Sequence, residues 1–198
     1  MRRLLLAATL LPAVLLTGCG GDDEPGAAGS AQGPGPTQLV SGATVRLRIP
    51  ADWRVLDLQA YRSGHPDAAT AALAVKLDVA SREGQDQLEV MAARVPVADS
   101  RYTEDLHVEV ARGADAELAV QMFRAATAVG ADVEQRDTAL GEAEVAMVDL
   151  PMGPEDLRLG LVLVQREDSV VSVVVSTLDE QLTAAVVDLA ITTLEATG

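Results

Sequence analysis

The chain has 198 residues, 15 basic and 30 acidic, with a formal net charge of −15 at pH 7. The length suggests one domain once any targeting segment is removed, and the charge makes binding of nucleic acid or an anionic lipid surface by the folded body unexpected. Hydrophobic residues make up 48% and aromatic residues 2%, which excludes a wholly disordered chain and predicts a core of Val, Leu, Ile and Ala.

The N-terminus has the pattern of an export signal. Two arginines follow Met1, and the uncharged apolar run Leu4–Leu16 comes next. This run is shorter than the about 20 apolar residues that cross a bilayer, but it fits the h-region of a signal peptide. We therefore predict a signal peptide over residues 1–18.

The only cysteine of the chain ends the sequence Leu16-Thr17-Gly18-Cys19. This resembles the lipobox of bacterial lipoproteins, with Leu at position −3, small residues at −2 and −1, and an invariant Cys. The resemblance implies cleavage before Cys19 and a diacylglyceryl group on its thiol, which would hold the mature chain on the membrane. The alternative is an ordinary secretory signal with a chance cysteine. Since no other cysteine remains for a disulfide, the fold depends on its core.

Residues 19–38 are rich in Gly, Pro and Ala and have no apolar periodicity. This composition is typical of a flexible linker, so we predict a tether here. The run Asp22, Asp23 and Glu24 is interpreted as solvated rather than as a ligand site. One folded domain is predicted over residues 39–198.

The domain is predicted to begin with a hairpin. Val45, Leu47 and Ile49 alternate with polar residues over 44–49, as in a half-buried strand, and a turn leads into a second strand over 53–56. A helix is predicted over 65–84, with Pro66 in its first turn, Gly84 at its end and one face formed by Leu73, Leu77 and Ala80.

Two strands are predicted next, over 87–97 and 106–110. The second places Leu106, Val108 and Val110 on one face and the pair His107 and Glu109 on the other, where solvent is expected. A helix over 115–129 follows, with Asp115 as its cap and Gly130 after its end. Its predicted buried stripe is Leu118, Met122, Ala125, Ala126 and Val129.

Four strands of an antiparallel meander come next, and the last of them, apolar on both faces, is expected to be central and covered on both sides. The predicted ranges are Val133–Leu140, Ala143–Leu150, Leu157–Gln165 and Val170–Ser176. A final helix begins with a capping box formed by Thr177 and Glu180. Its expected apolar face is Leu182, Val186, Leu189 and Thr193.

This order of elements predicts an α+β fold, a mostly antiparallel sheet with helices packed on it. Ile49-Pro50 with Trp53, and Gly141 with Ala143 after a turn, resemble in this order the PsbP-like α/β/α sandwich. Behind a lipobox, the pattern is similar to LpqN-type actinobacterial lipoproteins. The resemblance covers about residues 39–197. It implies accessory, partner-binding or small-ligand roles in the cell envelope and brings no catalytic residues.

No catalytic residue, metal ligand or cofactor is predicted. The chain lacks the G-x-S-x-G and S-x-x-K motifs, a phosphate loop and a dinucleotide fingerprint. His65 and His107 do not have the spacing of zinc ligands, and His107 with Glu109 lacks the cysteines of a zinc deaminase. Arg46 and Arg48 could bind an anionic headgroup, but pairing with acids on a neighbouring strand is favoured.

These patterns predict an extracytoplasmic lipoprotein, anchored to the membrane through Cys19, that is not an enzyme and binds an envelope protein partner. The alternative is a carrier or binder of a lipid or another small apolar ligand, because sheet-on-helix packing with small alanines could leave an apolar cavity. The sequence does not specify ligand-binding residues.

Overall fold

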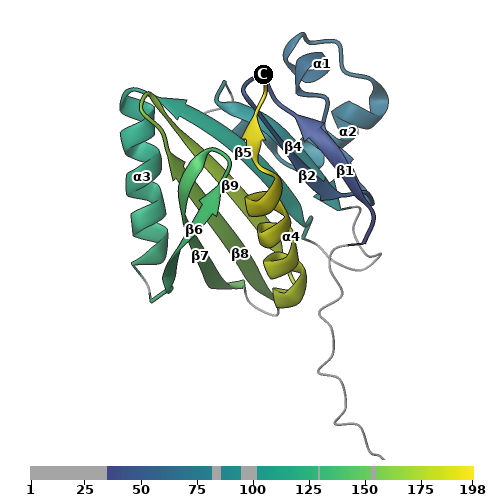
Figure 1. The fold of residues 1–198 in the computed structure, drawn as a ribbon. Coiled ribbons are helices and arrows are strands. Elements are labelled where there is room, and N and C mark those ends of the chain that lie inside the picture. Colours follow the sequence, from purple (N-terminus) through teal and green to yellow (C-terminus); the bar gives the residue numbers. More distant parts are fainter. Residues whose placement is uncertain (1–34, 82–85, 95–101, 129, 153–154) are drawn as a thin grey trace, which may run out of the picture. The chain divides into compact units, whose positions relative to one another are not determined.

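The computed structural model describes residues 35–81, 86–94, 102–128, 130–152 and 155–198 (Figure 1). The predicted signal peptide, Cys19 and most of the tether lie outside these residues. The helices are α1 (Leu58–Arg62), α2 (Ala68–Lys76), α3 (Ala114–Thr127), α4 (Glu180–Thr193) and the short 3-10 helix η1 (Val79–Ser81). The strands are β1 (Thr37–Ser41), β2 (Val45–Pro50), β3 (Trp53–Val55), β4 (Leu88–Arg94), β5 (Asp105–Arg112), β6 (Val133–Thr138), β7 (Gly141–Met152), β8 (Glu155–Gln165), β9 (Ser169–Thr177) and β10 (Glu195–Ala196).

The described strands form two sheets in which every pair is antiparallel. The small sheet has the order β1-β2-β10, and the large sheet has the order β3-β4-β5-β9-β8-β7-β6. The four α-helices pack on these sheets, which confirms the α+β class. The meander β6-β7-β8-β9 and the strand β5 are confirmed, and β9 is central, between β5 and β8.

The small sheet confirms one predicted strand and corrects its pairing. Val45, Leu47 and Ile49 of β2 are fully buried, as the alternation predicts. The predicted hairpin of 44–49 with 53–56 is wrong, because β3 pairs with β4 in the large sheet. Both edges of β2 are already taken, by β1 and β10. The strand β1 begins at Thr37, so Thr37 and Gln38, placed in the tether above, belong to the sheet.

The predicted helix over 65–84 is shorter in the structure. Its N-cap is Asp67, whose Oδ1 accepts a hydrogen bond from Thr70 N at 2.7 Å, and this bond lowers the pKa of the Asp67 carboxyl. The helix ends at Lys76 with Leu77 as its C-cap, because Asp78 has φ +48°, a conformation that interrupts a right-handed helix. Gly84 lies outside the described residues.

The helix α3 turns to the sheet a face that shares only Ala126 with the predicted stripe, of which Val129 lies outside the described residues. The buried side is Phe123 with the half-buried Ala116, Ala119 and Val120, whereas Leu118 is 51% and Met122 63% exposed. The prediction was wrong by about one residue, or about 100° around the helix, because the stripe with Phe123 buries the larger side chain. Gly113 and not Asp115 precedes the helix. Gly130, with φ +105°, follows it as predicted.

The helix α4 is capped by Asp179 rather than by Thr177. The Asp179 Oδ1 accepts from Leu182 N at 2.9 Å, and the Thr177 hydroxyl is hydrogen-bonded to the buried Thr183 hydroxyl at 2.6 Å. Glu180 is the first helical residue and no capping box forms. Of the predicted face only Val186 is fully buried. The residues buried with it are Thr183, Val187, Ala190 and Ile191.

The two faces of the large sheet pack against different elements (Figure 1). One face packs against the small sheet and α4 through the cluster that contains Val108, Val162 and Val173. On the other face, α1 and α2 cover the β4 end, and α3 covers residues of β7, β8 and β9. The strand β5, between these two coverings, carries the polar residues considered next.

Candidate ligand pocket

A polar stripe on β5 separates two apolar clusters on the helical face of the large sheet. Directly paired residues of antiparallel strands place their side chains on the same face, so His107 shares a row with Met91, Val174 and Leu161. Glu109 shares the next row with Leu88, Ser172 and Leu163. The rows run from the α1–α2 cluster, through polar residues, to the cluster under α3.

A pocket of about 560 Å³ opens over these rows beside α3. Its apolar part comes from α3 and the strands β8 and β9, and its polar part comes mainly from β5 and the residue before β4. The lining includes Leu118, Met122, Phe123, Leu161, Leu163 and Val174 on the apolar side, and Gln87, His107, Glu109, Asp115 and Ser172 on the polar side.

The exposure of Leu118 and Met122 follows from their place beside this pocket. They lie on the side of α3 next to Phe123, which anchors the helix on the sheet. Methionine is unbranched and polarisable and adapts to apolar partners of different shape. Leu118, Met122 and Ala126 of the predicted stripe therefore line the pocket.

The alternation along the strand predicted that His107 faces solvent. This prediction is wrong. The His107 side chain is only 12% exposed, and its Nδ1 lies 3.2 Å from Oδ1 of Asp105, whose side chain is 8% exposed. Asp105, which the sequence analysis did not consider, therefore holds one nitrogen of the imidazole. Alternation along β5 places 105, 107 and 109 on one face, which is the sequence signal that could have found this stripe.

Glu109 is half-buried in the same stripe. Its side chain has no hydrogen bond and no ion pair in the part of the chain that the structure describes. The other carboxylate of the pocket, Asp115, is exposed and lies in the first turn of α3, where the helix dipole favours a negative charge. Glu109 has no such explanation within the fold.

One face of the large sheet carries Ser172, His107 and Asp105, yet the arrangement does not form a nucleophilic triad. Ser172 is paired across the ladder with Glu109, whereas His107 is paired with Val174. Ser172 also lies inside the ladder of β9, between β5 and β8. Backbone amides of a central strand are used by its neighbours, so they offer no oxyanion hole beside the serine.

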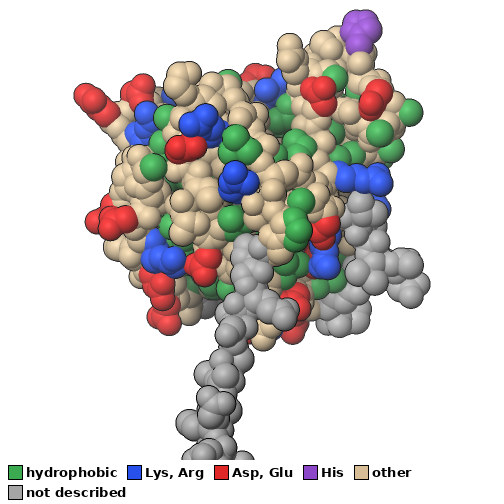
Figure 2. All heavy atoms as spheres, turned by 45° about the vertical axis from the view of Figure 1, so that its right-hand side comes forward, with side chains coloured by type: hydrophobic (Ala, Val, Ile, Leu, Met, Phe, Trp, Pro, Cys, Tyr) green, Lys and Arg blue, Asp and Glu red, His purple; other side chains and the backbone are tan. Residues whose placement is uncertain are grey.

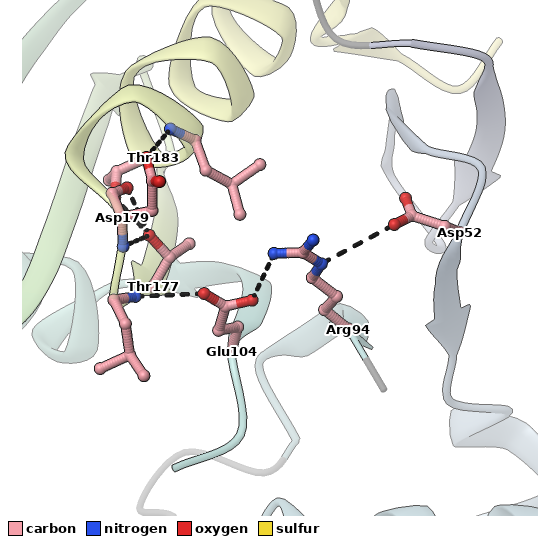
Figure 3. Close-up of polar contacts among 8 residues, drawn as sticks. Asp52, Arg94, Glu104, Thr177, Asp179 and Thr183 are labelled. Carbon is pink, nitrogen blue, oxygen red and sulfur yellow. Dashed lines mark hydrogen bonds and ion pairs between the residues drawn. The ribbon is translucent and has the colours of Figure 1, made fainter. Parts of the chain in front are cut away.

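A second polar cluster joins residues at one end of the strands β3, β4, β5 and β9 rather than lining the pocket (Figure 3). Glu104 Oε2 accepts from Arg94 Nη1 at 3.0 Å, and its Oε1 accepts from the backbone N of Leu178 at 3.2 Å. Arg94 Nε also lies 3.8 Å from Oδ2 of Asp52. Glu104 thus fixes the connection that leads into α4, which is a structural role.

The remaining candidate residues form surface contacts. Arg46 Nε pairs with Glu195 of β10 at 2.8 Å, as favoured above, and Arg48 Nη1 donates to the Thr37 hydroxyl at 3.2 Å. His65 is exposed, with Nδ1 2.7 Å from Ser63 O. On the face drawn in Figure 2, acidic and basic side chains are interspersed.

The described part of the chain offers neither a metal site nor a membrane-spanning helix. No group of three or more His, Cys, Asp or Glu side chains there could hold a metal ion. No helix there is both long enough and apolar enough to cross a membrane.

Comparison with solved structures finds likenesses to a PsbP protein and to LpqN, the kinds of protein that the sequence resembles. No protein-family model and no curated protein matches the chain. Among solved structures, PsbP (CyanoP) of Synechocystis sp. PCC 6803 is similar, with 13% identity and a TM-score of 0.46 over 92% of this chain and 99% of that one. LpqN of Mycobacterium tuberculosis, described as involved in cell envelope biogenesis, has 13% identity and a TM-score of 0.46 over 82% and 92%. These likenesses concern the fold alone.

Proposed function

We propose that this chain is an extracytoplasmic, lipid-anchored binding protein whose domain takes up a small amphipathic ligand in the pocket beside α3. The observation that carries this proposal is the pocket, whose volume of about 560 Å³ lies within the about 300–1,000 Å³ of small-molecule sites. Such sites combine an apolar lining with a few polar groups. Here Leu118, Met122 and Leu161 supply the apolar lining, and His107 and Glu109 supply the polar groups.

Binding rather than catalysis is supported by the chemistry of the lining. His107 lies against Asp105, Ser172 is paired across the ladder with Glu109 rather than with His107, and the described residues offer no metal cluster. The anchor is supported by the lipobox Leu16-Thr17-Gly18-Cys19 alone. An anchored domain would lie close to the membrane, where amphipathic molecules concentrate. The envelope protein partner predicted from the sequence has no counterpart among the features described above and stays a prediction.

The proposal is tested by ligand-dependent stabilisation of the full chain with Cys19→Ser, using 1-decanol as the probe. A ligand at about 100 times its Kd stabilises the folded state by about 2.7 kcal/mol, so we expect the Tm to rise by several degrees. Met122→Glu places a charge on the apolar wall at a side chain that is already exposed, and it should abolish the rise.

Gln121→Glu is the matched control, because Gln121 is an exposed neighbour on α3 that does not line the pocket. This variant should keep the full rise in Tm. The proposal is wrong if 1-decanol does not stabilise the unchanged pocket, or if both variants respond to it equally.

A further inference from the structure

The ligand's polar end can be specified from the charges of the pocket, an inference that rests on the proposed function. We infer that the ligand carries a positive charge, as an ammonium or guanidinium group, and that the Glu109 carboxylate binds this group. The apolar part of the ligand then lies between α3 and the strands β8 and β9.

The first observation in support of this inference concerns the burial and the contacts of the Glu109 side chain. A half-buried carboxylate without a hydrogen-bond or ion-pair partner is unfavourable, because it loses part of its hydration without compensation. The neighbouring carboxylates are compensated: Asp105 lies against His107, and Glu104 accepts from Arg94 and Leu178 N. Only Glu109 combines partial burial, a place in the pocket and the lack of a partner among these described acids.

The second support is the sign of the charge around the pocket. Glu109 and Asp115 contribute two carboxylates to the lining, and no Lys or Arg is among the described lining residues. The imidazole of His107 is directed to Asp105 by its Nδ1 contact. A carboxylate, sulfate or phosphate headgroup would therefore meet like charge here, whereas a cation would meet opposite charge.

The third support is the order of polar and apolar residues across the sheet. Glu109 on β5 is paired with Ser172 on β9, and Ser172 is paired with Leu163 on β8. Two strand spacings, about 10 Å in all, separate the carboxylate from the apolar floor under α3. A ligand with one charged end and an extended apolar part matches this order, and a compact polar cation does not.

The test uses three probes of equal chain length: decyltrimethylammonium, 1-decanol and decanoate. Each is titrated calorimetrically, below its micelle-forming concentration, into the full chain with Cys19→Ser. We expect decyltrimethylammonium to bind about tenfold more tightly than 1-decanol, which corresponds to about 1.4 kcal/mol. Decanoate should bind most weakly of the three.

Glu109→Gln keeps the shape of the side chain and removes its charge, so it should bring the affinities for decyltrimethylammonium and 1-decanol together. Glu117→Gln removes one charge from the exposed first turn of α3 outside the pocket and should leave the tenfold preference intact. The three-probe comparison on the unchanged pocket stands even if the Glu109 variant does not fold.

The outcomes separate the two claims. Binding of all three probes with equal affinity, or tightest binding of decanoate, would overturn the charge preference and leave the pocket as a general apolar site. The assignment to Glu109 is also overturned if both glutamine variants lose the preference equally. Binding of none of the probes would overturn the proposed function, and the charge preference with it.

Discussion

At the scale of single residues, Gly160 shows how closely α4 approaches the large sheet. A Cβ at this position would lie 2.2 Å from Cγ2 of Val187 and 3.2 Å from Cγ2 of Thr183. Both neighbours are buried, and the Thr183 hydroxyl is hydrogen-bonded to Thr177. Neither side chain can move without disturbing the packing of α4, so the glycine is required by a close contact rather than by a turn.

Gly160→Ala should therefore lower the free energy of unfolding by about 1–3 kcal/mol, the usual effect of overpacking a core. Gly35→Ala is the control, because a Cβ at Gly35 meets no atom within 4 Å. Urea unfolding of both variants measures the difference. Equal stability of the two variants would show that α4 does not pack against β8 in this way.

A Cβ at Gly42 would likewise lie 2.5 Å from Cβ of Glu89. The Glu89 carboxylate accepts hydrogen bonds from Thr44 N at 2.7 Å, the Thr44 hydroxyl at 2.6 Å and Val45 N at 3.1 Å. This side chain of β4 thus fastens the turn between β1 and β2 to the large sheet. No local pattern in the sequence indicates such contacts, which join Gly42 to Glu89 and Gly160 to Thr183 and Val187, so neither glycine could be assigned a role beforehand.

At the scale of elements, α3 is the helix whose orientation decides whether a pocket exists. With Phe123 against the sheet, Leu118 and Met122 form the pocket wall. The predicted stripe would have buried these two residues instead. Both stripes fit a period of 3.6 residues, so the choice between them depends on what each side chain meets on the sheet.

The two orientations of α3 predict opposite responses to alanine. In the observed one, Phe123→Ala removes a buried aromatic side chain and should lower the free energy of unfolding by about 3–5 kcal/mol. Leu118→Ala changes a side chain that is 51% exposed and should alter stability by at most about 0.5 kcal/mol. Denaturant unfolding measures both, and a larger effect of Leu118→Ala would contradict the observed face.

The strands were predicted more successfully than the helix faces and caps. The alternation in β2 and β5 and the turns of the meander define strands by local signals. The cap of α4 was misassigned to Thr177, because its hydroxyl is taken by Thr183, six residues further on. Likewise, the alternation placed His107 and Glu109 together on one face, but the cover that turns this face into a pocket comes from α3.

At the scale of the whole molecule, long-range pairing limited what the sequence could predict. The small sheet is completed by β10, whose two residues pair with β2 about 150 positions earlier in the chain. A two-residue strand has no periodicity to detect, so the predicted hairpin of β2 with the following strand was the best local choice. The α+β class could be predicted because it depends only on the number and order of strongly patterned elements.

The excess of acidic over basic residues is also a property of the whole molecule, and it bears on how the chain meets membranes and ligands. A net charge of −15 for the whole chain opposes binding to anionic surfaces, so we expect retention at a membrane to depend on the proposed lipid at Cys19 rather than on the protein surface. The same balance favours a cationic ligand over an anionic one at the pocket. The proposed anchor and the proposed pocket thus have complementary roles: one holds the domain at the membrane, and the other takes up a molecule there.

The most direct test of this account is a native mass spectrum of the mature chain extracted from the membranes of its host. We predict a polypeptide that begins at Cys19, carries a diacylglyceryl group and holds one additional small molecule non-covalently. The additional molecule should be absent from Met122→Glu and present in Gln121→Glu. A membrane-extracted chain with no bound molecule, or a bound molecule that both variants retain, would contradict the central claim that the pocket beside α3 is a ligand site.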